Sequence, residues 1–365
     1  MIEELKIRNF KSIREANFVF APTINIICGN NATGKTTCLD AIQYSFLLRT
    51  TSYRKGIELI NDLSDEATIE LSFLTKKGKK TRIVLISKYG QKMSIDGEEI
   101  KRTSDFITGT AIVSFSADDV NSIVGSPVLR RKMLNIIACQ LDHEYLILLN
   151  QYSKILKEKK KLLNDDCKID LVLFETLCEK QFSILVEIEN KITQFVNKLN
   201  IKIKKFYSLI CGQKETASIK LKPSFNVNKG LDDFLKNCNK EIQYRTVLFG
   251  CQRDDYIFSI DDDAIIGRAS QGQIKSLVLA FKLSCIELLK ENTGTDPIVL
   301  LDDVFGELDK ERQNFLLDFL TEQKNQIFIT TPSIADIYPR FIDSANIIYL
   351  EKGGVYRGHE GSWCL

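Results

Sequence analysis

Hydrophobic and polar positions change their period twice along this 365-residue chain. In the first third, short stretches alternate between apolar and polar residues, the period of a half-buried β-strand. These stretches are residues 5–7, 17–20, 67–73 and 81–86, and the lysine-rich segment 76–80 predicts a turn between the last two. We therefore expect a β-rich amino-terminal part.

The last third alternates between helical and strand patterns. Helices are predicted at 274–289 and 310–320, strands at 298–301 and 326–330, and a hairpin at 347–356 that turns at Gly353 and Gly354. Strands that alternate with helices are typical of an α/β fold with a parallel sheet.

The middle segment, about residues 119–246, has the period of helices. Ser126 followed by Pro127 is typical of a helix start. Further on, apolar residues step by three and four, as in a heptad seam: Leu185, Ile188, Ile192, Phe195 and Leu199. About two to three heptads at ~1.5 Å per residue make a rod of a few nanometres. We expect a short antiparallel helical arm; a packed helical bundle that does not project is the alternative.

A glycine-rich loop, GNNATGKT, separates the apolar run 24–28 from an amphipathic run at 37–48. It matches the phosphate-binding pattern G-x-x-x-x-G-K-[ST] in a strand–loop–helix setting. Lys35 would place a cation between the β- and γ-phosphates, and the Thr36 hydroxyl would bind Mg²⁺. An ordinary strand-to-helix turn is the alternative. The predicted ATP-binding residues here are Gly29, Asn30, Asn31, Ala32, Thr33, Gly34, Lys35, Thr36 and Thr37.

Two carboxylates, Asp302 and Asp303, follow an apolar run that reads as a buried parallel strand. Ligands of open α/β sheets bind at this end of the strands. We assign Asp302 to Mg²⁺ through a water molecule, and Asp303, together with Lys35, to catalysis. Asp303 would orient or deprotonate the attacking water. Two helix-capping carboxylates are the alternative.

The segment Ser270, Gln271, Gly272 and Gln273, called the signature segment below, precedes a long helical pattern. Ser270 fits a helix N-cap with open N–H groups behind it. Alone, the segment would also fit an ordinary loop. With the glycine loop and the Asp pair, it resembles the signature of ABC-type ATPases, which binds the γ-phosphate of a nucleotide held by the opposite subunit. Asp309, in the segment 306–309, resembles the loop that crosses this dimer interface.

Composition favours an intracellular globular protein. Hydrophobic residues make up 44% of the chain and charged residues 27%, and the formal net charge is +2. We find no signal peptide and no apolar run of about 18 residues that could span a membrane. The ten cysteines include no C-x-x-C pair, so we expect reduced thiols rather than a zinc or redox site.

The motifs together resemble those of the RecF family of the SMC and ABC-type ATPase clan. The resemblance rests on residues 5–10 (LKIRNF), 125–131 (GSPVLRR), the signature segment, 301–304 (LDDV) and 307–309 (ELD). The chain departs from the family at 250–255, where GCQRDD replaces G-P-H-R-D-D, and at 156–161 (LKEKKK). The resemblance implies an α/β ATPase head, residues 1–118 and 247–365, with a mainly helical insertion at 119–246.

The family also implies a function. RecF-like proteins bind double-stranded DNA as ATP-bound dimers, act with RecO and RecR, and help to load recombinase at gaps near single-strand to double-strand junctions. By resemblance, we expect an ATP- and Mg²⁺-dependent homodimer in the cytoplasm, associated with the nucleoid. Thr330 stands where many ABC-type heads carry a histidine that contacts the γ-phosphate, so we expect slow hydrolysis that times dimer opening.

Basic residues form clusters that could line a DNA groove in such a dimer, although each could equally be a solvated surface. The clusters are Arg8, Lys11 and Arg14; Arg49, Arg54 and Lys55; Lys76, Lys77, Lys79, Lys80 and Arg82; and Lys157, Lys159, Lys160 and Lys161. No recognition-helix pattern is visible, so binding should follow the DNA backbone and shape.

Three other classes fit the same motifs less well. A transporter ATPase would not need the middle insertion, and a structural SMC protein needs a far longer coiled coil. A nuclease of the ABC type would need an acidic metal-binding domain after the head, for which the sequence leaves no room. The residue that replaces the usual Gln-loop glutamine, the DNA structure preference and the RecR and RecO contacts stay open.

Overall fold

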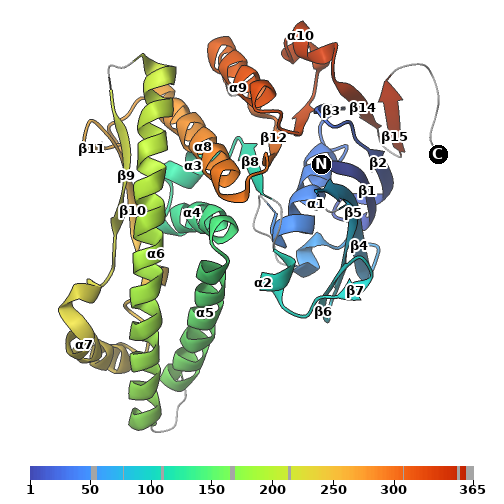
Figure 1. Cartoon of the computed structure of the whole chain (residues 1–365). Coiled ribbons are helices and arrows are strands. Elements are labelled where there is room, and N and C mark those ends of the chain that lie inside the picture. The colour runs from blue at the N-terminus through green and yellow to red at the C-terminus, as the bar shows by residue number, and fades with distance from the viewer. Residues whose placement is uncertain are drawn as a thin grey trace. The chain divides into compact units, whose positions relative to one another are not determined.

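The computed structural model describes residues 1–50, 56–76, 78–107, 111–164, 169–212, 215–306, 308–351 and 354–358 (Figure 1). Several residues used in the predictions lie outside this part: Arg54, Lys55, Lys77, Glu307 and Gly353. The chain divides into two compact units, Met1–Asp118 with Leu289–Leu365, and Asp119–Leu288. The second unit starts where the insertion was predicted to start and ends later than residue 246; the assignment of domains by function stays a prediction.

The first unit contains a mainly parallel sheet with strand order β15-β14-β3-β13-β12-β8. Only β15 runs antiparallel to its neighbour. Every residue of β3 and β13 is buried, as expected for strands covered on both faces. The strands are β3 (Ile24–Cys28), β8 (Ile112–Ser116), β12 (Ile298–Asp302), β13 (Ile327–Thr331), β14 (Asn346–Glu351) and β15 (Gly354–Gly358).

The second sheet of this unit is antiparallel, with order β2-β1-β4-β5-β6-β7. In β4 and β5, buried residues alternate with half-buried ones, which confirms the period-two pattern at 67–71 and 81–86, whereas residues 71–73 are all buried. The strands are β1 (Ile2–Phe10), β2 (Ile13–Val19), β4 (Glu66–Thr75), β5 (Gly78–Ser87), β6 (Gly90–Ile95) and β7 (Glu98–Glu99).

Helix α1 (Lys35–Leu47) contacts strands of both sheets. All its residues except Thr36 are buried, so the prediction of an amphipathic helix was wrong. Because apolar strands lie on both sides of α1, it has no broad face for water. The remaining short elements of the unit are η1 (Gly56–Leu59), α2 (Thr103–Phe106), η4 (Val304–Gly306), α9 (Lys310–Glu322), η5 (Ile334–Asp336) and α10 (Pro339–Ile342).

The second unit is mainly helical. Its longest element is α6 (Leu171–Cys211), which packs against α5 (His143–Asn164) and α7 (Gly230–Tyr244). The five residues of the predicted heptad seam are all buried on α6. The other helices are α3 (Asp119–Val124), α4 (Pro127–Leu141), η2 (Val227–Lys229), η3 (Cys251–Arg253) and α8 (Gln271–Thr293), whose last residues belong to the first unit.

The prediction that the middle segment is helical was partly wrong, because this unit also contains a three-stranded antiparallel sheet. Strand β9 (Ala217–Lys222) pairs with β10 (Asp255–Ile260), which pairs with β11 (Asp263–Ala264). Ala217 and Ile219 are buried, because they face one side of the strand. Their partner strand lies about forty residues further along the chain, so no local pattern announced this sheet.

No helix in the described ranges is long and apolar enough to cross a membrane. The cysteines that these ranges contain are all free, and five of them are buried: Cys28, Cys38, Cys178, Cys238 and Cys285.

Candidate nucleotide-binding site

The glycine loop connects β3 to α1 in a conformation that requires glycine at two positions. Gly34 has a φ of 107°, in the left-handed region. A Cβ on Gly29 would lie 2.2 Å from the backbone oxygen of Leu350 on β14. The loop is therefore held tightly against the sheet, and its backbone can approach a ligand closely.

Lys35 occupies the centre of this loop. Its ammonium Nζ donates to the backbone oxygens of Gly29 (2.7 Å) and Asn30 (2.9 Å), and the residue is buried. Asn30, Asn31, Ala32 and Thr36 are exposed, while Thr37 is buried and shares a hydrogen bond with Ser12. The loop carbonyls thus hold the Lys35 ammonium at the position from which a phosphate-binding lysine contacts phosphate oxygens.

Four of the predicted site residues meet at the carboxyl ends of β12 and β13. The Thr36 hydroxyl donates to Asp302 Oδ1 at 3.0 Å, and the Thr330 hydroxyl donates to the same oxygen at 2.7 Å. Thr330 in turn accepts the backbone N–H of Asp303 at 3.0 Å. The parallel pairing of β12 with β13 places Asp302 beside Thr330.

The Asp302 carboxyl is costly to ionise in this position. Burial raises its pKa, and the negative charges of Asp40 and Asp303 raise it further, against the two threonine hydrogen bonds that lower it. A cation bound beside Asp302 would offset both the burial and the repulsion.

Asp303 is exposed and has a φ of 52°, in the left-handed region that non-glycine residues rarely adopt. Its side chain is accessible, as expected for a residue that handles water, and strained backbone of this kind is found at functional sites. The role in catalysis assigned to Asp303 and Lys35 stays a prediction.

Sequence reasoning missed Asp40, which lies one helical turn after Thr36 on α1. Its buried carboxylate forms an ion pair with Lys11 from the turn between β1 and β2. The i, i+4 spacing from Thr36 was the available signal, since such residues share one helix face. Asp40 belongs to the electrostatic surroundings of Asp302.

Asp309 is the N-cap of α9 within the first unit. Its carboxylate accepts the Arg312 backbone N–H at 2.9 Å and forms an ion pair with the Arg312 side chain. About half of the side chain is exposed. These contacts lie within one chain, so the place of Asp309 at a dimer interface stays a prediction.

The signature segment lies in the second unit, at the start of α8. Ser270, Gln271 and Gly272 are exposed. The Ser270 hydroxyl accepts the Gln273 N–H at 3.2 Å, and the Gln273 side chain accepts the Ser270 N–H at 2.8 Å. This reciprocal pair is a capping box, which agrees with the predicted N-cap and leaves the helix start exposed.

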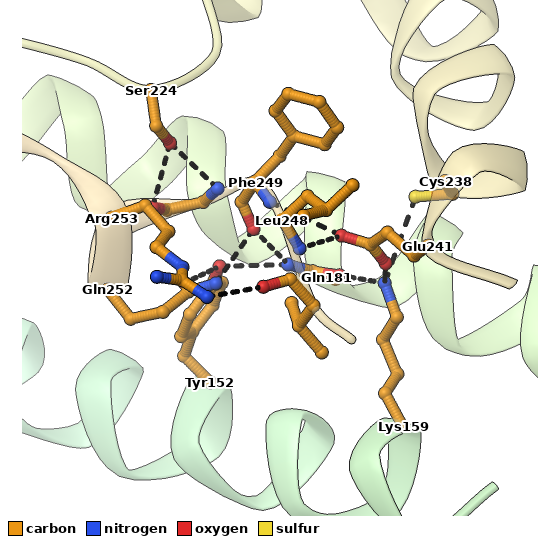
Figure 2. A network of polar contacts seen from close by, with 12 residues as sticks. Tyr152, Lys159, Gln181, Ser224, Cys238, Glu241, Leu248, Phe249, Gln252 and Arg253 are labelled. Carbon is orange, nitrogen blue, oxygen red and sulfur yellow. Dashed lines mark hydrogen bonds and ion pairs between the residues drawn. The ribbon is translucent and has the colours of Figure 1, made fainter. Parts of the chain in front are cut away.

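Three cations of the predicted DNA clusters are buried or partly buried and have partners within the chain. Lys11 pairs with Asp40, and Arg82 is buried among the rings of Phe46, Phe73 and Phe106. Lys159 is fully buried and pairs with Glu241 at 2.7 Å (Figure 2). The prediction that Arg82 and Lys159 face DNA was wrong, because the core encloses both side chains. Lys11 is partly exposed, and its ammonium is held by the buried Asp40 carboxylate.

The two family-like segments 125–131 and 250–255 contact each other in the second unit. Arg130 binds Asp255 with two hydrogen bonds, at 2.8 and 2.9 Å, and also donates to the backbone oxygens of Ile123 and Gly125. Arg131 donates to the backbone oxygen of Asp254 at 2.5 Å. These arginines therefore hold the unit together.

Gln252, which stands where the family has histidine, joins the buried polar network of Figure 2. Its amide donates to the Phe249 backbone oxygen at 2.8 Å, and its oxygen accepts the Tyr152 hydroxyl at 2.7 Å. Gln181 donates to both Tyr152 and Phe249, and accepts from Lys159. The departure from the family pattern is thus accommodated by hydrogen bonds inside the unit.

Comparison with known proteins agrees with this architecture. The family model of the RecF/RecN/SMC N terminal domain matches residues 1–335. The chain is 32% identical to the DNA replication and repair protein RecF of Halalkalibacterium halodurans, covering 97% of this chain and 98% of the relative. It is 30% identical to RecF of Staphylococcus carnosus, covering 98% of this chain and all of the relative.

Solved structures agree as well. A structure of the recombination mediator protein RecF with ATP has a TM-score of 0.88 and 26% identity, covering 98% of this chain and 97% of that one. An SMC head bound to the C-winged helix domain of ScpA shares the fold, with a TM-score of 0.54 and 14% identity over 98% of this chain and 97% of that one. The predicted ABC/SMC-type α/β fold is confirmed, and the chain belongs to the RecF family of DNA replication and repair proteins.

Proposed function

We propose that this chain is an ATP-controlled DNA clamp of recombinational repair and replication restart. ATP binding drives two copies into a head-to-tail dimer on double-stranded DNA, and slow hydrolysis releases it. The observation that carries the proposal is the meeting of the glycine loop, Thr36, Asp302 and Thr330 at one sheet edge, together with an exposed signature segment. The RecF structure solved with ATP supports the choice of nucleotide.

The donor set suits Mg²⁺. Thr36 Oγ1 and Asp302 Oδ1 are 3.0 Å apart, and adjacent ligands of an octahedral ion with bonds of ~2.0–2.1 Å are separated by about 3 Å. Thr36 would hold the ion directly and Asp302 directly or through water. When bound, the ion neutralises charge on the β- and γ-phosphates.

Each residue of the site then has a defined task. Lys35 exchanges its loop carbonyls for phosphate oxygens, and residues 29–34 supply backbone N–H groups. Thr330 orients Asp302 through its hydroxyl, and the N–H of Asp303 binds that same hydroxyl. Asp303 positions or deprotonates the water. Because no cationic side chain occupies the Thr330 position, the γ-phosphate receives less stabilisation there, and turnover is slow.

Ser270 completes the site of a second copy. Its exposed capping box offers a hydroxyl and the positive end of the α8 dipole to an anion. Asp309 would lie at the same interface. DNA would be held through its phosphates by cations that remain exposed, among them Arg8, Arg14 and Arg49. RecO and RecR are the proposed partners, and the complex would work in the cytoplasm near the nucleoid.

Light scattering after size-exclusion chromatography tests the proposal. Wild type, Lys35→Arg and Ser270→Arg are compared with and without Mg²⁺-ATP and duplex DNA. We expect only wild type to dimerise, and Ser270→Arg to bind ATP but stay monomeric. If ~6 phosphates are neutralised, the DNA affinity should fall by roughly three decades between low and moderate salt. Rapid turnover by a monomer without DNA would contradict the proposal.

A further inference from the structure

The signature segment is attached to the rest of its unit through the side chain of Gln273. The oxygen of this amide accepts the Ser270 N–H, as described above, and its nitrogen donates to Glu215 Oε1 at 2.8 Å. Gln273 therefore serves two partners at once. In a capping box this position is filled by glutamate or glutamine, but only glutamine can also donate to a carboxylate.

Glu215 is itself held on two sides. Its second oxygen accepts the Tyr207 hydroxyl of α6 at 2.9 Å, and Tyr207 is fully buried. Burial, and after it the hydrogen bond to Glu215, raises the pKa of Tyr207, so this phenol stays a donor. The residue after Glu215, Thr216, donates its N–H to Asp261 at 2.8 Å. The carboxylate thus has a fixed position from which to hold Gln273.

A hydroxyl that must meet a phosphate needs a defined direction. The Ser270 oxygen accepts the Gln273 N–H, so one lone pair is fixed and the hydroxyl can still donate its own hydrogen to an acceptor. Hydrogen bonds from fixed neighbours hold a hydroxyl in such a direction, and even a small displacement of a binding group reduces function strongly.

We propose that Glu215 is a positioning residue for the signature segment: it holds the Gln273 amide, which closes the capping box and directs the Ser270 hydroxyl toward the nucleotide of a second copy. This inference rests on the proposed ATP-dependent dimer. Glu215 touches no nucleotide in it and acts only through Gln273.

A reciprocal exchange of side chains tests the contact. Gln273→Glu keeps the capping box but sets a second carboxylate against Glu215, so that the two repel each other. Adding Glu215→Gln restores the hydrogen bond in the opposite direction: the new amide at position 215 donates to the carboxylate at position 273. Its oxygen can still accept the Tyr207 hydroxyl. Glu179→Gln, at an exposed position of α6, is the matched control for the loss of one charge.

The readouts are the dimer dissociation constant in Mg²⁺-ATP with duplex DNA from sedimentation velocity, the ATP affinity of the monomer, and the melting temperature. We expect Gln273→Glu to weaken dimerisation at least about tenfold, the size of one lost hydrogen bond of ~1.4 kcal/mol. The double variant and Glu179→Gln should lie within about threefold of wild type. ATP affinity should stay within about twofold throughout, which a general loss of structure would not allow.

Two results would overturn the inference while the proposed function stands: wild type and Gln273→Glu dimerise equally, or the double variant is as weak as Gln273→Glu. If Gln273→Glu does not fold, the comparison of Glu215→Ala with Glu215→Gln decides, and only the alanine variant should weaken dimerisation. A wild-type chain that stays monomeric in Mg²⁺-ATP with duplex DNA removes the proposed function, and this inference with it.

Discussion

Replacing Asp302 by asparagine should separate the metal-binding role of this residue from its effect on the fold. The amide oxygen of Asp302→Asn can still accept the Thr36 and Thr330 hydroxyls, so the local geometry is kept. What changes is the charge. The carboxyl has a raised pKa in the folded state because of burial and of Asp40 and Asp303. Its ionised form therefore opposes folding when no cation is bound.

The sign of the pH dependence follows from that shift. A carboxyl with a raised folded pKa leaves stability unaffected below its unfolded value of ~3.9, and reduces stability as pH rises toward the folded pKa. Without Mg²⁺-ATP at pH 7, Asp302→Asn should thus melt at the same temperature as wild type or slightly higher. This difference should shrink as the pH is lowered to about 4.

With ligand the order should reverse. At a ligand concentration of about 100 times the dissociation constant, wild type gains about 2.7 kcal/mol. If the variant binds Mg²⁺-ATP about 100-fold more weakly, it gains only about 0.4 kcal/mol at the same concentration. The difference corresponds to several degrees in melting temperature for a chain of this size.

Differential scanning calorimetry between pH 4 and 8, with and without Mg²⁺-ATP, measures both effects. Asp343→Asn, an exposed acid of the same unit, is the control and should behave as wild type. The reasoning is refuted if Asp302→Asn shows the full ligand-induced shift, or if it is clearly less stable than wild type at pH 7 without ligand.

Three further variants probe other contacts. Lys35→Arg should lose most of the melting shift caused by ATP, measured in the same calorimeter, because the wider guanidinium does not fit between the loop carbonyls. Asp255→Asn should destabilise the chain by about 3 kcal/mol in urea titrations, since it leaves the buried Arg130 charge without its carboxylate; a change below about 1 kcal/mol would contradict the structural role of Arg130. Lys159→Met should cost about 3–5 kcal/mol in the same titrations, because it leaves the Glu241 carboxylate buried without its cation, and it should leave the DNA affinity in a filter-binding assay unchanged. A marked loss of DNA affinity in a folded Lys159→Met protein would show that this lysine does reach DNA.

The sequence by itself determined the parts of the fold that local patterns specify. The glycine loop needs Gly34 for its left-handed backbone, and Asp302 follows a strand whose apolar run marks it as buried. The heptad residues of α6, such as Leu185 and Leu199, likewise carry their period in the sequence. In each case neighbouring residues decide the conformation, so a linear pattern is enough.

Only the tertiary structure decided which polar groups face each other. The packing buried every residue of α1 except Thr36, enclosed Lys159 beside Glu241, and paired β9 with a distant strand. It also joined Glu215 to Gln273. The last three contacts link residues 33 to 82 positions apart along the chain. A lysine or glutamate has the same local pattern whether it ends in water or in a buried ion pair. Burial and polar contacts depend on the packing of the whole chain, which a local sequence pattern does not specify.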